Sequence, residues 1–466
     1  MEVSLPLSNR VEPSKREALK PKNNSPVQPF NISTASIALP LSFILAGLLA
    51  LFTGASWLVL QPEILAAYHY NANAIAATHL FALGWLCSVV MGAMYQLVPV
   101  ALETKLFSER LAKIQFVFHI VGFVGMVLAF RVWNMKFVAA FGSIFAIGVA
   151  LFIYNVARTL LRIPKWNVIA AAVASALGWI LLTVSAGLLI ASAKTGHANF
   201  MFHFNPIGAM HAHAHLGTLG FFIMLIVGVS YKLIPMFTLS EIQNHRRALV
   251  SVILLNVGLA GSFVSILLQL VVKPLFALII VAAFVIYGRE MTAILRARKR
   301  RALDWGVRYF LTAIALLAPL SILALILSWP KLPLNPFTGQ LENVYGFVAF
   351  VGVISFAVIG MLYKIIPFLV WFGIYSKHIG CTQVPALAEM VSEKLQRLGY
   401  GIFLTALAVT IFGILFSNAM AVRIGSAFFA ASLTTLALNV GKILSHYFQP
   451  KLAPLAAPKN YDRNKN

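Results

Sequence analysis

Gly228-Val-Ser-Tyr231-Lys-Leu-Ile-Pro235 is one of three copies of a motif that decides how this chain folds. The other copies are Gly92-Ala-Met-Tyr95-Gln-Leu-Val-Pro99 and Gly360-Met-Leu-Tyr363-Lys-Ile-Ile-Pro367. Each copy ends an apolar passage with Gly-x-x-Tyr, one further residue, two aliphatic residues and Pro. The three prolines are about 136 and about 132 residues apart, which suits a block of four membrane helices and is too long for a solenoid repeat. The repeat predicts an all-α chain of three related four-helix blocks.

Composition predicts a polytopic membrane protein. Of the 466 residues, 60% are hydrophobic and only 11% are charged, with a mean hydropathy of +0.87. Such a chain is solvated by lipid, and about 20 apolar residues suffice for one helical crossing. The twelve expected spans are residues 36–60, 74–100, 111–131, 136–160, 167–192, 205–236, 247–271, 274–295, 305–329, 343–372, 397–417 and 420–447.

Lys and Arg residues predict how the chain is oriented. They gather in alternate loops and in the polar segment before the first span, and positive loops are retained in the cytoplasm. We therefore expect a flexible cytoplasmic tail over residues 1–35, a membrane domain over 36–447 and a second cytoplasmic tail over 448–466, in a bacterial-type inner membrane. The net charge of +23 is explained by basic loops that face anionic lipid, without nucleic acid as a partner.

Histidines give the first indication of chemistry. The residues 20 positions before the three repeat prolines are His79, His215 and Phe347, so two blocks place an imidazole at one depth and the third does not. An imidazole inside a membrane is costly to leave unpaired, and it is the usual protein ligand of heme iron and of copper. The alternative for His79 is a histidine that only packs against its neighbours.

The sixth span contains the segment His211-Ala-His213-Ala-His215. On a helix, His211 and His215 share one face, whereas His213 points to nearly the opposite side. The three histidines are therefore suited to two neighbouring sites. The alternative is that they hydrogen-bond to the backbone or to water where the helix enters the membrane.

Two segments carry a resemblance to a known family. Thr78-His-Leu-Phe-Ala-Leu-Gly-Trp85 and His213-Ala-His-Leu-Gly-Thr-Leu-Gly220 are similar to segments in divergent members of the heme-copper oxidase superfamily, which includes cbb-type oxidases and nitric oxide reductases. Twelve spans in three blocks are typical of its subunit I. The histidine-rich sixth span also resembles the NnrS family of heme- and copper-containing membrane proteins. The resemblance covers residues 36 to 447.

The resemblance implies that His79 is an axial ligand of a low-spin heme. It also implies a copper ligand among His211, His213 and His215, and a cytochrome c or other redox subunit as partner. The chain departs from the family in two spans, because neither 247–271 nor 343–372 contains a histidine. Tyr345 and Phe347 stand where ligands of the tenth span are sought. A standard binuclear centre cannot be assembled from such spans.

Acidic residues argue against proton pumping, which normally needs carboxylates at depth. The glutamates in or near the spans all fall at span ends or in loops: Glu63, Glu103, Glu241, Glu290 and Glu342.

Three functions remain open at this point. The first is a redox or metal-handling protein that binds heme, or copper, through His79 and the segment from His211 to His215. The second is an oxygen or nitric oxide reductase with rearranged ligands, and the third is a transporter or scaffold without cofactors. The first is favoured, with His79 and His215 as cofactor ligands and with His211, His213 and His215 as metal ligands. No catalytic residue is assigned, and enzymatic activity is left open.

Overall fold

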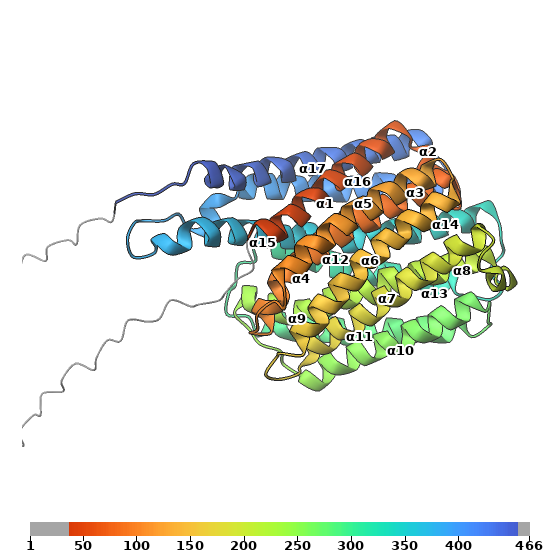
Figure 1. Ribbon diagram of the computed structural model, residues 1–466, viewed down its shortest axis with the longest axis horizontal. Helices are drawn as coiled ribbons and strands as arrows, with labels where there is room; N and C mark the ends of the chain where they lie inside the picture. The colour runs from red at the N-terminus through yellow and green to blue at the C-terminus, as the bar shows by residue number, and fades with distance from the viewer. Residues whose placement is uncertain (1–36, 455–466) are drawn as a thin grey trace, which may run out of the picture. The chain divides into compact units, whose positions relative to one another are not determined.

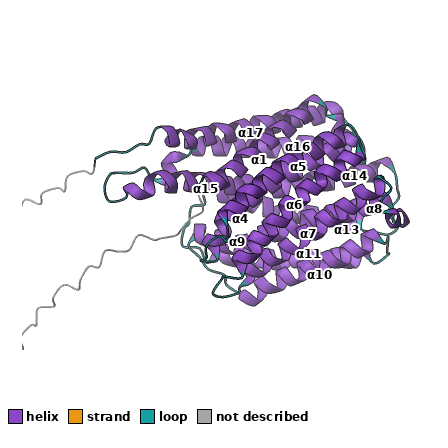
Figure 2. Ribbon diagram, viewed as in Figure 1, coloured by secondary structure: helices purple, strands orange, loops and turns teal. Residues whose placement is uncertain are grey.

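The fold is a bundle of membrane helices. A computed structural model describes residues 37–454, apart from the side chains of Asn199 and Phe202. Within this part no strand forms, and one isolated bridge joins Gln383 to Ala453 (Figure 2). The tail predicted over residues 1–35 and the end of the second tail lie outside the described residues.

Within residues 37–454, twelve helices are long and apolar enough to cross a membrane, so the chain is a multi-pass membrane protein, as predicted. The spans are Ala38–Leu60 (α1), Ala72–Ala101, Glu109–Arg131 (α5), Met135–Leu160 (α6), Val168–Lys194 (α7), Pro206–Thr238, His245–Leu267 (α10), Lys273–Arg296 (α11), Trp305–Leu327 (α12 and α13), Pro336–His378, Glu393–Leu415 (α16) and Ala419–Phe448 (α17).

Most of these boundaries lie within four residues of the prediction, but the tenth span begins at Pro336 rather than at 343. Its first turns carry Gln340, Glu342 and Asn343. These polar residues lower the local hydropathy, so hydropathy alone placed the start of the helix too late. A capping box fixes that start: the Asn335 side chain accepts from the Thr338 N–H, and the Thr338 hydroxyl accepts from the Asn335 N–H.

Asparagine, serine and aspartate side chains begin ten of the twelve spans. Each accepts a hydrogen bond from an N–H in the first turn, which satisfies a donor that lipid cannot satisfy. The ten residues are Asn71, Ser108, Asn134, Asn167, Asn205, Asn244, Asp304, Asn335, Ser392 and Asn418.

The second, sixth and tenth spans, which carry the repeat, form the centre of the bundle. They are 67, 78 and 78% buried, whereas the other nine spans are 22 to 50% buried. The outer helices expose aliphatic side chains such as Leu49, Leu128, Leu278 and Ile322, as expected of helices that face lipid.

Each central span has the same internal division. A first helix ends at the residue 20 positions before the repeat proline, then eight residues form a π-helix, and a second α-helix carries the repeat motif. The elements are α3 (Ala72–His79), η1 (Leu80–Cys87) and α4 (Ser88–Ala101); α8 (Pro206–His215), η3 (Leu216–Ile223) and α9 (Met224–Thr238); and α14 (Pro336–Phe347), η4 (Val348–Ser355) and α15 (Phe356–Tyr375). The three residues that the repeat aligns, His79, His215 and Phe347, are thus each the last residue before the π-helix of their span.

The π-helices meet at the centre of the molecule. η4 contacts both η1 and η3. The buried indole N–H of Trp85 in η1 donates to the hydroxyl of Ser355 in η4, at 3.0 Å. This contact is a polar link between the first and third copies of the repeat.

A second feature recurs three times, at the end of the bundle where α4, α9 and α15 terminate. We call this the basic end, because the Lys- and Arg-rich loops lie there, and it is on the left in Figure 1. A fully buried side chain of α6, α11 or α17 accepts from the backbone N–H of a residue 47 positions earlier, at the start of the preceding helix. The pairs are Asn155 with Ser108 at 3.0 Å, Glu290 with Gln243 at 2.8 Å and Asn439 with Ser392 at 2.7 Å.

Candidate functional site

The predicted site residues lie at the opposite end of the bundle, which carries α3, α8 and α14 and which we call the histidine end. It is on the right in Figure 1. A cavity of about 1420 Å³ opens there between the central spans and their neighbours. Pockets for drug-sized ligands are about 300–1,000 Å³, so this cavity is large enough for a bulky cofactor. Its lining includes five histidines, namely His69, His79, His211, His213 and His215.

His79 and His213 both line this cavity, and their rings lie close together. Their ring centres are 6.5 Å apart, and the ring planes differ by only 16°. Nδ1–H of His79 donates to the Ile75 carbonyl at 2.8 Å, and Nδ1–H of His213 donates to the Thr183 carbonyl at 2.9 Å. A neutral imidazole that donates from Nδ1 carries its lone pair on Nε2. These hydrogen bonds to the backbone therefore leave Nε2 of both rings available to accept a hydrogen bond or to bind a metal.

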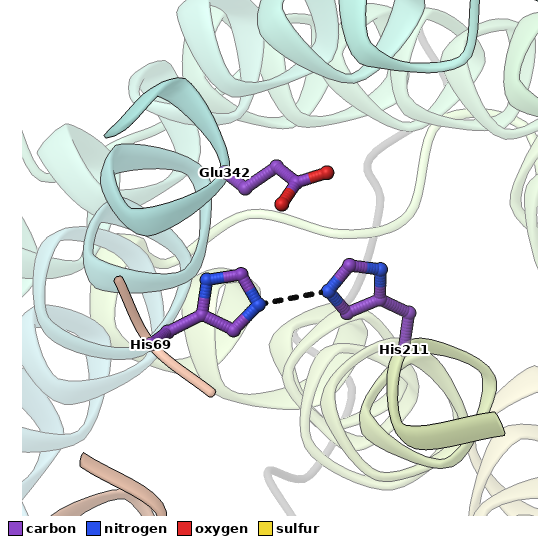
Figure 3. A group of neighbouring side chains, drawn as sticks. All are labelled: His69, His211 and Glu342. Atoms are coloured by element: carbon purple, nitrogen blue, oxygen red, sulfur yellow. Dashed lines mark hydrogen bonds between the residues drawn. The ribbon is translucent and has the colours of Figure 1, made fainter. Parts of the chain in front are cut away.

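His69, His211 and Glu342 form a second group (Figure 3). One donor atom from each residue lies within 4.8 Å of the other two, and Nε2 of His69 is 3.0 Å from Nε2 of His211. His69 follows the short helix α2 (Glu63–Ala66) in the loop before α3, whereas His211 belongs to α8 and Glu342 to α14. Three distant segments of the chain thus meet at one point.

Two buried amides fix the tautomer of His69. Gln340 donates from Nε2 to the Ala66 carbonyl, which turns its Oε1 toward Asn343. Asn343 donates from Nδ2 to that oxygen and to the Ala67 carbonyl, each at 2.7 Å. The Oδ1 of Asn343 therefore accepts a hydrogen bond from Nδ1–H of His69, at 2.7 Å. Nδ1 of His69 therefore carries the proton, and Nε2 directs a lone pair toward His211.

Tyr68 and His69 lie outside the spans, and their surroundings affect their ionisation. Burial lowers the pKa of His69 below its usual value, so the ring is neutral at neutral pH. Burial, together with the nearby Glu342 carboxylate, raises the pKa of Tyr68 to about 12. The phenol remains protonated and donates to Oε2 of Glu342 at 3.4 Å.

His215 has a partner of its own. Its Nδ1–H donates to the His211 carbonyl at 2.7 Å, and its Nε2 accepts from the Tyr345 hydroxyl at 3.4 Å. The His215 and Tyr345 rings are 5.8 Å apart and nearly parallel at 23°. Tyr345 belongs to the tenth span, whose predicted range of 343–372 contains no histidine.

The structure therefore brings all four predicted site residues to one cavity but gives the three histidines of α8 different neighbours. His213 faces His79, His211 faces His69, and His215 faces Tyr345. Their separation follows from helix geometry, which the sequence already indicated for His213. Sequence reasoning missed His69 and Glu342 as partners of His211. No spacing rule joins positions 69, 211 and 342 in the sequence.

Comparisons with known proteins bear on the fold. No protein-family model matches the sequence, and no curated protein matches it. Among solved structures, the cryo-EM structure of a heme-copper terminal oxidase dimer is similar, with a TM-score of 0.66 and 11% sequence identity. The match covers 91% of this chain and 88% of that chain. The chain has the fold of a heme-copper oxidase, as the resemblance predicted.

Proposed function

We propose that this chain is a heme-binding redox protein of the membrane, in which His79 and His213 are the two axial ligands of one six-coordinate heme. The observation that carries the proposal is the close, nearly parallel placement of these two rings, each anchored through Nδ1. Heme, when bound, supplies one-electron transfer. His79 and His213 would hold the group through their Nε2 atoms.

The ring geometry supports this ligand pair. Two imidazoles on opposite sides of one iron have ring centres about 6.3 Å apart, because each nitrogen lies about 2.0–2.1 Å from the metal and each ring centre about 1.1 Å beyond its nitrogen. The separation of the His79 and His213 rings is 6.5 Å. The separation of the two ring centres is therefore compatible with ligation of one iron by both rings.

The surroundings of the rings support it further. Carbonyl acceptors on Nδ1 orient metal-binding imidazoles and raise their basicity, and both rings have one. Phe130 packs against His79 with ring centres 4.5 Å apart, and Gly187 leaves room beside His213, since a Cβ there would come within 2.9 Å of the ring. These contacts hold both rings in place.

A second candidate is a reductase of oxygen or nitric oxide with rearranged ligands. It is favoured by one observation: His215 presents a further Nε2 to the same large cavity, with only the 3.4 Å contact to Tyr345. Such an enzyme needs a five-coordinate heme, with His215 as its single ligand. It would consume gas when supplied with an electron donor, whereas a protein with a single bis-histidine heme would not.

Partners and location complete the proposal. A six-coordinate heme near the histidine end would exchange electrons with a cytochrome c or another redox subunit that docks there. The basic loops at the other end of the bundle favour a cytoplasmic location for both termini, in a bacterial-type inner membrane.

Optical spectra of the purified protein, oxidised and dithionite-reduced, test the proposal. We expect a Soret band and close to one heme per chain. We expect His79→Ala to lose nearly all of this heme while still inserting into the membrane. Phe347→Ala, at the equivalent position of the third block, is the matched control and should retain it. A well-folded protein without heme would overturn the proposal and favour a transporter or scaffold.

A further inference from the structure

We infer that His69, His211 and Glu342 bind a divalent first-row transition-metal ion, at a site separate from the proposed heme. The inference goes beyond the proposed function and does not depend on it. Its three ligands come from the loop before α3, from α8 and from α14, and none of them belongs to the His79–His213 pair (Figure 3).

The facing nitrogens of the two histidines are the first argument. The Gln340–Asn343 pair obliges His69 to direct its Nε2 lone pair at Nε2 of His211, 3.0 Å away. Two imidazole nitrogens bound to one tetrahedral ion are about 3.3 Å apart. To bind one ion, the two nitrogens move apart by about 0.3 Å. The proton on Nε2 of His211 passes to solvent, and the neutral ring carries its proton on Nδ1 instead.

The carboxylate is the second argument. Glu342 lies beside both histidines, and its Oε2 already accepts from Tyr68, so Oε1 remains for an ion. Tyr68 also packs against the His69 ring, with ring centres 4.3 Å apart. Hydrogen-bond partners behind each ligand are what metal sites require. Here Asn343 supports His69, and Tyr68 supports Glu342.

The donor set defines the class of ion. Two imidazoles and one carboxylate suit Zn²⁺, Cu²⁺ or Fe²⁺, whereas Mg²⁺ and Ca²⁺ prefer oxygen ligands alone. All three ligands line the cavity, so the fourth coordination position faces it. Three protein ligands with one open position are typical of sites where a water or a small molecule completes the coordination.

The test uses the full chain as purified, stripped with a chelator and titrated with Cu²⁺ alone and then with Zn²⁺ alone in calorimetry. We expect close to one ion per chain. His69→Ala and Glu342→Gln should each weaken binding by at least tenfold, and Asn343→Ala by about 10–100-fold through loss of ligand orientation. His203→Ala is the matched control, because this exposed histidine lies at the same end but does not line the cavity.

Electron paramagnetic resonance of the Cu²⁺ form gives an independent readout, since nitrogen hyperfine structure should lose one imidazole in His69→Ala. Absence of stoichiometric binding, or equal binding in His69→Ala and wild type, would overturn the inference and leave an ordinary hydrogen bond between the two histidines. Heme content measured on the same samples separates this result from failure of the proposed function, because we expect His69→Ala to keep its heme.

Discussion

The two ends of the bundle bury polar side chains in different ways. At the basic end, Asn155, Glu290 and Asn439 are fully buried and bound to the backbone at the start of the preceding helix. At the histidine end, His79 and His213 are each anchored through Nδ1 to a backbone carbonyl, and both rings line the cavity.

We propose that this difference separates polar groups that serve the fold from groups that bind a ligand. Leaving a buried polar group without a partner costs about 1–3 kcal/mol, so groups that serve the fold are expected to be satisfied within it. An imidazole that is held rigidly on one side, with its lone pair open to a cavity, is instead prepared for a ligand. The predictions below test this division, from the largest expected effect to the smallest.

Removal of both rings of the proposed heme site should have the largest effect. We expect the double variant His79→Ala/His213→Ala to bind no heme, and each single variant to lose most of it, because one imidazole alone holds the iron weakly. The measurement is heme extracted per chain. A double variant that still carries heme would place the cofactor elsewhere in the cavity.

Glu290→Ala should act in the opposite way to the histidine variants. We expect a large loss of stability and an unchanged heme spectrum. Glu290 accepts from the N–H groups of Gln243 and Asn244 and forms an ion pair with Arg247 at 3.2 Å. Loss of these contacts should cost about 3 kcal/mol of the free energy of unfolding. The midpoint of thermal unfolding in detergent checks this.

Glu290→Gln is the matched control, because its amide oxygen can still accept from the two N–H groups and only the ion pair is lost. Arg247 is 36% exposed and can be solvated, so we expect less than half of the effect of Ala. If the two substitutions destabilised equally, the ion pair rather than the hydrogen bonds would be the dominant contribution.

Asn439→Ala should destabilise by about 1–2 kcal/mol, in the range found for the loss of a helix N-cap. Its Oδ1 accepts from the Ser392 N–H at 2.7 Å, and its Nδ2 donates to the Ser392 carbonyl at 3.3 Å. The same thermal measurement applies. A change in heme content here would mean that the two ends are not separable.

Gly187→Ala should have the smallest effect, confined to the histidine end. The added Cβ would lie 2.9 Å from Cε1 of His213, so the ring must shift. We expect heme to be retained with altered absorption or midpoint potential, and thermal stability close to wild type. Gly178→Ala is the control, because nothing lies within 4 Å of a Cβ at that position. Identical spectra for both variants would indicate that His213 is not a ligand.

The sequence predicted the fold largely because the repeat marks equivalent depths in three membrane helices. Hydropathy located the spans, and the distance from the prolines placed His79 and His215 in one register. The π-helices escaped prediction, since their hydrophobic pattern does not differ from that of an α-helix. The recurrent caps also escaped, because the asparagines Asn155 and Asn439 are replaced by Glu290 in the second block.

The site was less predictable than the fold. The residues of α8 could be divided by helical geometry, but their partners are set by tertiary packing. His69 comes from a loop whose path depends on Gln340 and Asn343 in the tenth span. Glu342 was judged by its position at a span end, whereas its importance comes from the two histidines beside it.

The most direct test of the central claim is low-temperature electron paramagnetic resonance of the oxidised protein and its His213→Ala and His215→Ala variants. The account predicts a low-spin bis-imidazole signal in wild type, its replacement by a high-spin signal or its loss in His213→Ala, and its persistence in His215→Ala. A low-spin signal that survives in His213→Ala and disappears in His215→Ala would contradict the account.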